Sequence, residues 1–525
     1  MSQNLYQKLL EYYSLQENDI LFYKNQSLNT IKDFHAFKDV FKIVDYLKDA
    51  ISKNRKILIY GDYDCDGITS VSIMYLTLKT NEYKPGYYIP NRDHDGYGIT
   101  KENIDLFHSL NYEIIVLVDN GISLNENVEY INSLGMECII LDHHKIMNEI
   151  PKAKYIMHPD IDEYGPYNIS AGEVSFFFSW AYLGHIDDYL LVLAMLSTIG
   201  DVMPIQSYNK VLVREGLKIL NESKNYDFKV IKNLVGKELD SIESITEDEI
   251  ARYVVPKINS ICRVKNDNSR FNIVKYFIYG RCSVDYNLSR WIDAVNDQRK
   301  QLVEENQKQD FDNEKNIIFI ENKSVEGISG LIASKFYNDY DKPTFVICKN
   351  ASNPKLFKGS ARSGPGYDVS KALDYCKEYL AAYGGHEGAG GFSVYEENVE
   401  ALKEKLNDKN LFNEASKENK DSKFIDIDVE DLTLENYRII REFAPFGETF
   451  KKPIFRIKDI PLSLCTKDKS GKHLFFRPNQ HISIVYFNFD PKIETKQTFN
   501  ILGNINIHVF RGVKSIQFNV NEVQY

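Results

Sequence analysis

The chain is predicted to be an α/β protein of several domains, and three features of its sequence support this prediction. Its 525 residues exceed what one hydrophobic core can organise. Short apolar strands alternate with helical segments in the first part of the chain, and the alternation returns after residue 315. Such alternation is typical of a parallel sheet with helices on both faces. Short strands fill the C-terminal part, which predicts a small β-barrel there.

The first domain is expected over residues 1–215, where an amphipathic N-terminal helix precedes the first strand. The sequence KILIY at 56–60 has the apolar and β-branched character of a buried strand, and GDYDCDG and a helical segment follow it. Two further strands of this type end in DNG at 119–121 and in DHH at 142–144. Because ligands bind at the carboxyl edge of a parallel sheet, the three polar clusters are expected to lie close together.

The rest of the chain is expected to form a helical connector, a second α/β domain and the barrel. The connector is charged and helical over 216–312, and the second domain alternates strands and helices over 313–412. A charged stretch at 413–423 is predicted to be a linker. Roughly five or six short strands over 424–525 predict a barrel of the OB type.

The composition of the chain bears on its cellular compartment and on whether it can bind nucleic acid. Apolar residues make up 43% and charged residues 26% of the chain, and no apolar run reaches the roughly 18 residues of a membrane span. The seven cysteines are scattered without a CxxC pair, which indicates reduced thiols, so the protein is expected in the cytoplasm and away from membranes. The net charge of −11 argues against a uniformly basic surface for nucleic acid.

A local excess of basic residues near the C-terminus weakens that argument. Between positions 451 and 477 the acids are Asp459 and Asp468 alone. The basic residues of this stretch are Lys451, Lys452, Arg456, Lys458, Lys467, Lys469, Lys472 and Arg477. They are compatible both with a solvated strand face and with a surface that contacts phosphates.

Asp62, Asp64 and Asp66 alternate in GDYDCDG. An EF-hand loop has the same spacing, but its twelfth residue is a glutamate, where this chain has Ile73, and a helix rather than a strand precedes it. A surface turn is a second alternative, since Asp and Gly favour turns. Two carboxylates about 4 Å apart repel each other by about 4 kcal/mol at an effective dielectric of about 20. A cation would offset that repulsion, so the motif favours a metal site.

Asp119, the triplet Asp142-His143-His144 and Asp201 also follow apolar segments. Asp119 alone is compatible with a tight turn, because Asn-Gly comes after it. The triplet is more specific, since imidazole is a common metal ligand and a neighbouring carboxylate can orient it. Asp201 ends an apolar helix, where a carboxylate opposes the helix dipole unless a cation compensates for it.

Taken together, these clusters supply several carboxylates and at least one imidazole. Mixed oxygen and nitrogen ligands suit Mn²⁺ or Mg²⁺ better than an ion that prefers thiolates. Two such ions that share a bridging aspartate form an arrangement that hydrolyses phosphate esters. The residues therefore predict a two-metal phosphodiesterase.

The series DYDCDG, VDNG, LDHH and Gly-Asp after an apolar helix resembles the four motifs of the DHH phosphoesterases. GSARS at 359–363 and GGHEGAGG at 384–391 resemble the DHHA1 domain that accompanies them. Four more segments resemble the RecJ family of single-strand-specific 5′→3′ exonucleases, namely YIPNRDHDGYGIT, PKINSICR, GISGLIASKFYNDYDKPT and FAPFGETFKKPIF. The resemblance extends over residues 50–480 or so and is carried by the combination of these segments.

The resemblance implies roles for individual residues. The implied metal ligands are Asp64, Asp66, Asp119, His143 and Asp201, with Asp119 as the bridging one. The residues implied to act beside them or at the scissile phosphate are Asp62, His144 and Arg263. The residues implied to bind the substrate are Asn259, Arg362, His386, Gly384 and Gly385, where the glycines let backbone amides approach a phosphate.

The chain departs from the family's pattern at three places. Ser324-Val325 stands where a Trp-His pair is usual, beside the expected DHHA1 contacts. Ile261-Cys262 stands where an Ala-Gly pair is usual, beside the expected DNA path. Gly200 stands where alanine is usual. None of these departures removes an expected metal ligand.

The function expected from the residues and the resemblance together is a two-metal exonuclease that degrades single-stranded DNA 5′→3′ to mononucleotides in recombination and repair. The alternatives are a phosphodiesterase of the same superfamily acting on short oligonucleotides or cyclic dinucleotides, and an inactive scaffold of a replication complex. The length and FAPFGETF speak against the first, and the intact acidic and histidine motifs against the second. Expected partners are single-stranded DNA and a single-strand-binding protein or helicase, and the chain is expected to be a monomer.

Overall fold

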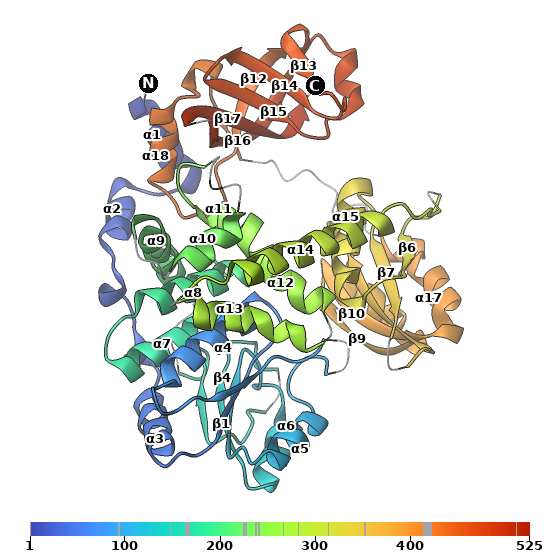
Figure 1. Cartoon of the computed structure of the whole chain (residues 1–525). Coiled ribbons are helices and arrows are strands. Elements are labelled where there is room, and N and C mark those ends of the chain that lie inside the picture. Colours follow the sequence, from blue (N-terminus) through green and yellow to red (C-terminus); the bar gives the residue numbers. More distant parts are fainter. Residues whose placement is uncertain are drawn as a thin grey trace.

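The computed structural model places a helical body between two α/β units, with a β unit at the far end of the body (Figure 1). The structure describes residues 2–92, 95–147, 149–162, 168–223, 228–236, 239, 242–265, 267–281, 283–312, 314–350, 353–412, 423–510 and 512–524. Strands within these ranges form one sheet of five strands, another of five and a third of seven. This architecture confirms the predicted fold class. None of the described helices has the length and apolar character that crossing a membrane requires.

The first sheet is parallel throughout, and its described strands have the order β2-β1-β3-β4-β5. The strands are β1 (Ile57–Tyr60), β2 (Gly86–Tyr88), β3 (Ile114–Val118), β4 (Glu137–Leu141) and β5 (Tyr155–Met157). Strands β1, β3 and β4 are buried over nearly their whole length, which explains why their sequences are apolar without alternation.

Helices cover both faces of this sheet, because successive strand residues point to opposite sides. The helices of this unit are α3 (Val40–Ser52), α4 (Cys65–Leu78), α5 (Lys101–Ser109), α6 (Asn125–Ser133), α7 (Ala171–Leu183), α8 (Asp188–Gly200) and α9 (Ser207–Glu222). Ile59 and Val116 share a core with residues of α3, α4 and α7, whereas Tyr60 and Leu117 share one with α5 and α6. The two cores fix the sheet and thereby the start of every loop at its carboxyl edge.

A helical body follows, and one of its turns is irregular. Its helices are α10 (Lys229–Val235), α11 (Glu247–Glu249), α12 (Val255–Val264), α13 (Asn272–Gly280) and α14 (Tyr286–Asn306). A π-helical turn at Ile250–Val254 joins α11 to α12, and the Val255 N–H donates to the Ile250 carbonyl across it. Pro256 follows in the first turn of α12, where its missing N–H is tolerated.

The second α/β unit has a mixed sheet with the order β6-β7-β8-β10-β9 in its described residues. Only β6 and β7 pair in parallel there. The strands are β6 (Ile318–Asn322), β7 (Thr344–Lys349), β8 (Leu356–Arg362), β9 (Leu380–His386) and β10 (Ala389–Tyr395), and the helices are α15 (Ser329–Tyr340), α16 (Val369–Tyr375) and α17 (Val399–Leu406). Phe345, Phe392 and Leu402 lie in its core.

The C-terminal unit is a seven-stranded sheet within the described ranges, ordered β11-β12-β16-β17-β15-β14-β13. Its elements are β11 (Ile425–Asp426), α18 (Leu434–Arg441), β12 (Phe455–Pro461), β13 (Cys465–Lys467), β14 (Leu474–Asn479), β15 (Ile482–Tyr486), β16 (Thr498–Phe510) and β17 (Val513–Gln524). The predicted linker falls outside the described residues over 413–422.

Helix α1 (Ser2–Tyr13) packs against this C-terminal unit rather than against the first sheet, as Figure 1 shows. Its residues Leu5, Leu9 and Leu10 lie on one apolar stripe and are buried in the same core as Ile425 and Phe443. Helix α2 (Glu17–Asn25) continues from it toward the first unit. The expectation that the N-terminal helices belong with the first sheet therefore differs from the observed packing of α1. An apolar stripe predicts burial but does not specify the surface that buries it.

Much of the basic stretch between positions 451 and 477 is neutralised by ion pairs. Lys452 pairs with Asp248 of the helical body. Arg456 and Lys458 both contact Asp426, at 2.7 and 3.2 Å. Because these charges already have acidic partners, the structure favours a solvated, paired strand face over a free cationic surface at these positions.

Candidate metal centre

The polar clusters of the first unit meet at the carboxyl edge of its sheet. The loop 62–66 follows β1, Asp119 follows β3 and His143 follows β4. Since these strands are neighbours in the sheet, the three loops are adjacent although they are far apart in the sequence. Asp201 comes from the C-terminal end of α8 and faces the same point.

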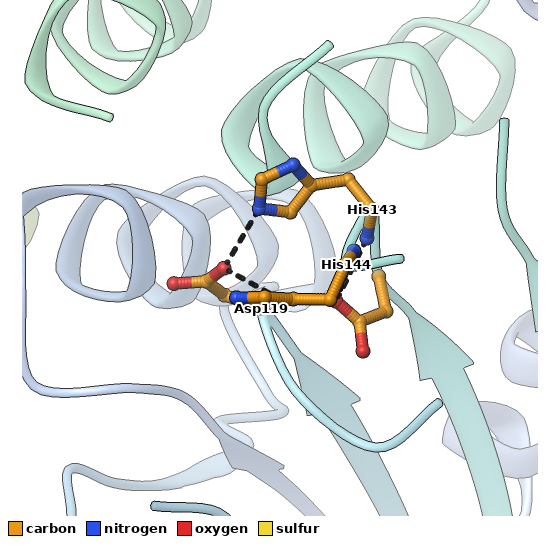
Figure 2. Close-up of side chains that lie close together, drawn as sticks. Asp119, His143 and His144 are labelled. Carbon is orange, nitrogen blue, oxygen red and sulfur yellow. Dashed lines mark hydrogen bonds and ion pairs between the residues drawn. The ribbon is translucent and has the colours of Figure 1, made fainter. Parts of the chain in front are cut away.

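The imidazole of His143 lies at the centre of this group and points at the Asp119 carboxylate (Figure 2). His143 Nε2 is 3.3 Å from Asp119 Oδ1 and 3.4 Å from Asp66 Oδ2. It is 3.6 Å from Asp201 Oδ2. His144 Nδ1 lies 3.8 Å from the same Asp119 oxygen. Carboxylates from three separate segments therefore surround one imidazole nitrogen.

The possible ligand atoms form overlapping groups, in each of which they lie within 4.8 Å of one another. In the described residues these groups are Asp62-Asp64-Asp119, Asp66-His143-Asp201 and Asp119-Asp142-His143-His144. Asp119 belongs to the first and third groups, and His143 belongs to the second and third. Asp119 thus links the first group to the third, and His143 links the third group to the second.

Asp66 is held in place by residues far from its own loop. Its carboxylate accepts the backbone N–H groups of Ala171 and Gly172 at 2.8 and 2.7 Å, at the start of α7. The hydroxyl of Ser197 on α8 donates to it at 2.5 Å. The N-terminus of a helix favours a negative charge, so α7 stabilises this carboxylate in the position that faces His143.

Asp64 caps helix α4, which begins at the next residue. Its Oδ1 accepts the N–H groups of Asp66 and Gly67 at 3.0 and 3.2 Å. A Cβ at Gly67 would lie 2.5 Å from the Asp62 backbone, so the loop closes only with glycine there. The cap and the glycine together account for the local sequence of GDYDCDG.

Asp119 has a left-handed backbone with φ of 60°, a conformation that aspartate and asparagine adopt more readily than most residues. The Asn120 side chain donates to the Val118 carbonyl at 2.8 Å, and Gly121 has φ of 117°. The tight-turn interpretation and the ligand interpretation are therefore compatible, because the turn directs the Asp119 carboxylate toward His143.

Asp142 orients His143 and His144 through hydrogen bonds to the backbone of the first and the ring of the second. Its Oδ1 accepts the His143 N–H at 2.7 Å and the His144 ring N–H at 2.8 Å, and its Oδ2 accepts the Ile122 N–H at 3.0 Å. Burial acts to raise the pKa of Asp142, but the hydrogen bond and charge of His144 hold it well below its usual value. Burial acts to lower the pKa of His144, but the hydrogen bond to Asp142 raises it to about 9.

The electrostatics of the cluster fit a divalent cation. Burial and the charge of Asp64 raise the pKa of Asp62 to about 8, and burial and Asp66 raise the pKa of Asp201 to about 8. Burial lowers the pKa of His143, which favours the neutral imidazole that metals bind. Asp62 Oδ1 and His143 Nε2 are buried without a hydrogen-bond partner in the described structure. Mn²⁺ or Mg²⁺ would supply that partner and relieve the repulsion.

The charges of Arg92, Arg263 and Arg362 act on one another and on the acids, and these three residues are called the arginine cluster. Burial and the charge of Arg92 lower the pKa of Arg263 to about 10, while Asp64 acts in the opposite direction. Burial and Arg92 also lower the pKa of Arg362. Asn259 lies one turn before Arg263 on α12, and its Oδ1 is buried without a partner in the described structure. The mutual repulsion of these guanidinium groups favours an anionic ligand beside them.

The other residues implied to bind substrate lie at one end of the second sheet. Arg362 on β8 is in register with Ala389 on β10, which is in register with His386 on β9. A Cβ at Gly385 would lie 2.4 Å from the Ala389 carbonyl, whereas Gly384 borders open space. The described contacts of His386, Gly384 and Gly385 stay within this sheet. Of the described residues at this end of the sheet that are implied to bind substrate, Arg362 alone belongs to the arginine cluster.

Two of the three departures from the family's pattern have a structural account. The Ser324 hydroxyl accepts from Asn306 at 2.9 Å and donates to Asn322 at 2.7 Å, which ties α14 to β6. Ile261 and Cys262 are buried, and both belong to the large core of the first unit and the helical body. These residues therefore support the structure from behind the site rather than lining it.

The third departure, Gly200, is explained by Cys65. A Cβ at Gly200 would lie 2.8 Å from both Cβ and Sγ of Cys65, closer than carbon atoms approach in proteins. Cys65 is 1% exposed and its Sγ donates to the Leu196 carbonyl, so it has little room to move. Cys65 stands between Asp64 and Asp66, and Gly200 directly precedes Asp201. The two residues therefore form a matched pair that sets the distance between α4 and α8.

We expect Gly200→Ala to weaken Mn²⁺ binding by at least about tenfold, because overpacking at this contact shifts Asp201 away from the other acids. The double variant Cys65→Ala/Gly200→Ala is expected to bind Mn²⁺ with nearly wild-type affinity, since the smaller side chain removes the clash. Titration of Mn²⁺ followed by electron paramagnetic resonance measures both. Equal losses in the single and double variants would contradict the pairing.

The comparisons with known proteins agree with this architecture. Three family models match the chain: the DHH family N-terminal domain at residues 56–198, the DHHA1 domain at 315–410 and the RecJ OB domain at 425–522. The chain thus carries a DHH domain, with the acidic groups at the edge of its sheet, followed by a DHHA1 domain. The model that matches the C-terminal unit is the OB domain of RecJ, which points to RecJ proteins among the proteins with these domains.

The chain is similar to RecJ proteins over most of its length. It is 29% identical over 455 residues to the single-stranded-DNA-specific exonuclease RecJ of Bacillus subtilis, which covers 84% of this chain and 56% of that protein. It is 24% identical over 471 residues to RecJ of Escherichia coli, with 82% and 79% coverage. The crystal structure of RecJ from Thermus thermophilus in complex with Mn²⁺ matches with a TM-score of 0.75 at 21% identity, covering 93% of this chain and 72% of that one. The chain therefore spans little more than half of the Bacillus relative.

Sequence reasoning missed residues that hold the ligands in position. Ser197 lies inside an apolar helix, and nothing in the sequence around it indicates that it donates to Asp66. His158 follows strand β5 and donates to the His144 carbonyl at 2.9 Å. The sequence KYIMHPD repeats the pattern of an apolar strand followed by polar residues, and this signal could have identified His158.

Proposed function

We propose that the protein is a metal-dependent exonuclease that degrades single-stranded DNA from its 5′ end to mononucleotides, in recombination and repair. One observation carries the proposal, which is that Asp119 joins two sets of ligand atoms at the edge of a DHH-type sheet. The relatives from Bacillus and Escherichia are named single-stranded-DNA-specific exonucleases, and the matching Thermus structure contains Mn²⁺. The shared DHH, DHHA1 and RecJ OB domains support a common activity.

The acidic edge would hold two divalent ions, Mn²⁺ or Mg²⁺. The first set of ligands is Asp62, Asp64 and Asp119, and the second is Asp66, His143 and Asp201, with Asp119 as the bridging residue. Such a pair of ions, when bound, activates water and neutralises the charge of the phosphodiester. Asp142 and the start of α7 keep the ligands in place, because they fix His143 and Asp66 from behind.

Positive groups beside the ligands are suited to the phosphate. His144 donates its Nδ1 hydrogen to Asp142, and its side chain is 41% exposed, so a positively charged ring can face the substrate. Arg263 lies close enough to Asp64 for their charges to interact, and it can bind the scissile phosphate through its planar fork of donors. Asn259, one turn away on α12, would contact the phosphate through its side-chain NH₂ group, which is the donor of the amide.

A cavity of about 740 Å³ adjoins the arginine cluster and is suited to the path of the strand. Its charged and amide walls come from α12, α14 and the π-helical turn: Arg252, Lys257, Asn259, Arg263, Asp293, Asn296, Asp297, Arg299 and Lys300. Five cations against two acids give it a positive balance, and Arg263 belongs to both the cavity and the arginine cluster. Positive grooves of this kind bind the backbone of single-stranded nucleic acid.

The proposal also covers the limits of the four domains, the location of the protein in the cell and its protein partners. The limits are 1–215, 216–312, 313–412 and 424–525, and α1 of the first range packs in the core of the last domain. We place the protein in the cytoplasm as a monomer. A single-strand-binding protein or a helicase is the partner that would supply or expose its single-stranded substrate.

Strands labelled at one end test the proposed function directly. With Mn²⁺, the protein should release a labelled mononucleotide at once from 5′-labelled single strands and only late from 3′-labelled ones. An Asp64→Ala control should be inactive, because it loses a ligand of the first set. Degradation from the 3′ end, equal activity of the Asp64→Ala control, or faster hydrolysis of a dinucleotide than of a long strand would each contradict the proposal.

A further inference from the structure

We propose that His158 is a positioning residue of the metal centre, which acts on His143 through the backbone of the loop that follows β4. The inference rests on the metal-dependent activity proposed above. His158 directly follows β5, the edge strand of the first sheet, and its side chain is fully buried. It lies outside every described group of ligand atoms, so it acts through other residues.

The hydrogen bonds of the His158 ring define which nitrogen carries the hydrogen. The backbone N–H of Asp160 donates to Nδ1 at 3.2 Å, so this nitrogen is an acceptor. Nε2 therefore carries the hydrogen, and it donates to the His144 carbonyl oxygen at 2.9 Å. The ring is thus a specific donor to the backbone of the metal-binding loop.

Two hydrogen bonds from the β5 side hold that loop on both sides of His143. The Asp142 N–H donates to the Met157 carbonyl at 3.3 Å, and His158 donates to the His144 carbonyl. Since His143 lies between these two anchors, its backbone has little freedom to rotate. Loss of the second anchor would let the peptide after His143 turn, and the position of His143 Nε2, 3.3 Å from Asp119, depends on that peptide.

His158 is itself fixed, which a positioning role requires. Its backbone N–H donates to Asp162 Oδ2 at 3.2 Å, and the Asp162 N–H donates back to the His158 carbonyl at 3.0 Å. Asp162 Oδ1 accepts the Lys38 N–H at 3.1 Å, from the segment before α3. The turn after β5 is therefore attached to the body of the domain, and it transmits that rigidity to the loop of His143.

Two substitutions test this role: one removes the hydrogen-bond donor and keeps a ring of similar size, and the other keeps a donor without the ring. His158→Phe keeps a planar ring but removes the donor, and we expect it to weaken Mn²⁺ binding by about 10- to 100-fold, the usual cost of losing a group that orients a metal ligand. His158→Gln places an amide N–H near the position of Nε2, and it should restore the affinity to within about threefold of wild type. His185→Phe is the matched control, because His185 also contacts a backbone carbonyl but is exposed and lies outside every described group of ligand atoms.

Three measurements on each full-length variant decide the outcome: Mn²⁺ titration by electron paramagnetic resonance, the unfolding temperature without metal, and exonuclease activity. Should His158→Phe fail to fold, His158→Met repeats the removal of the donor with a flexible side chain. The inference alone would be overturned if folded His158→Phe or His158→Met bound Mn²⁺ with wild-type affinity. It would also be overturned if His158→Gln lost as much Mn²⁺ affinity as His158→Phe. Mn²⁺ binding by the wild type without nuclease activity would overturn the proposed function alone, and no Mn²⁺ binding by the wild type would overturn both.

Discussion

Replacing Asp119 by asparagine is expected to lower the Mn²⁺-dependent exonuclease activity by more than about 100-fold, the scale of one electrostatic contact to a transition state. Asp119 is 2% exposed, and its carboxylate joins the ligand set of Asp62 and Asp64 to that of His143. Asparagine has nearly the same shape and tolerates the left-handed backbone at this position, but it lacks the charge. The loss therefore reports on metal binding and not on folding.

The same variant is expected to be more stable than the wild type when no metal is present. Burial and the neighbouring Asp66 and Asp64 raise the pKa of Asp119 well above its usual value, which shows that its negative charge is unfavourable in the empty cluster. Asparagine removes that charge without creating a cavity. Added Mn²⁺ should raise the unfolding temperature of the wild type strongly and that of the variant weakly, since only the wild type binds it tightly.

Thermal unfolding with and without Mn²⁺, beside the activity assay, measures both effects of Asp119→Asn. The control is Asp339→Asn, whose carboxylate pairs with Lys335 at 2.9 Å on the surface of α15 and should change neither quantity. An Asp119→Asn protein with wild-type activity, or with lower stability in the absence of metal, would show that this carboxylate does not belong to a metal centre.

Replacing Glu247 by alanine is expected to destabilise the attachment of the C-terminal unit by about 3–5 kcal/mol, the usual effect of breaking a buried ion pair. Both carboxylate oxygens of Glu247 pair with the Arg441 guanidinium, at 2.6 and 2.9 Å, and one of them also accepts the Phe446 N–H at 3.1 Å. Glu247 is 3% exposed and the Arg441 side chain 23% exposed, so removal of Glu247 leaves a largely buried charge without its carboxylate partner. FAPFGETF supplies Phe446, which gives this segment a structural role.

Urea unfolding of full-length variants, followed by circular dichroism, measures the effect of Glu247→Ala. The double variant Glu247→Met/Arg441→Met is expected to recover most of the loss, because it removes both charges and keeps the volume. Glu494→Ala breaks an exposed pair with Lys467, in which each side chain is 46% exposed, and should cost less than about 1 kcal/mol. If Glu247→Ala and Glu494→Ala lowered the free energy of unfolding equally, Glu247 would not stabilise the C-terminal unit in the way proposed.

The position of the candidate site could be predicted from the sequence, because it depends on a local pattern. Each of Asp62, Asp119 and His143 follows an apolar strand, and parallel strands bring their carboxyl ends to one edge. The strand character of these segments is encoded within a few residues, and the rule of parallel sheets then places them together. The same reasoning gave the α/β class and the separate C-terminal β unit.

The supports of the site could not be predicted in this way, because they depend on contacts between distant segments. Asp66 is held by Ala171 and Ser197, and neither residue belongs to a recognisable motif. The packing of α1 on the C-terminal unit and the pairing of Lys452 with Asp248 are equally remote in the sequence. Such contacts follow from the assembled fold, in which any apolar stripe or charge can choose among several surfaces.

The central claim is that two divalent ions share Asp119. Anomalous diffraction at the manganese absorption edge, from crystals grown with Mn²⁺, tests it most directly. The account predicts two peaks about 3.5–4 Å apart, one among Asp62, Asp64 and Asp119 and the other among Asp66, His143 and Asp201, with Asp119 in contact with both. A single peak, or peaks that do not touch Asp119, would contradict it.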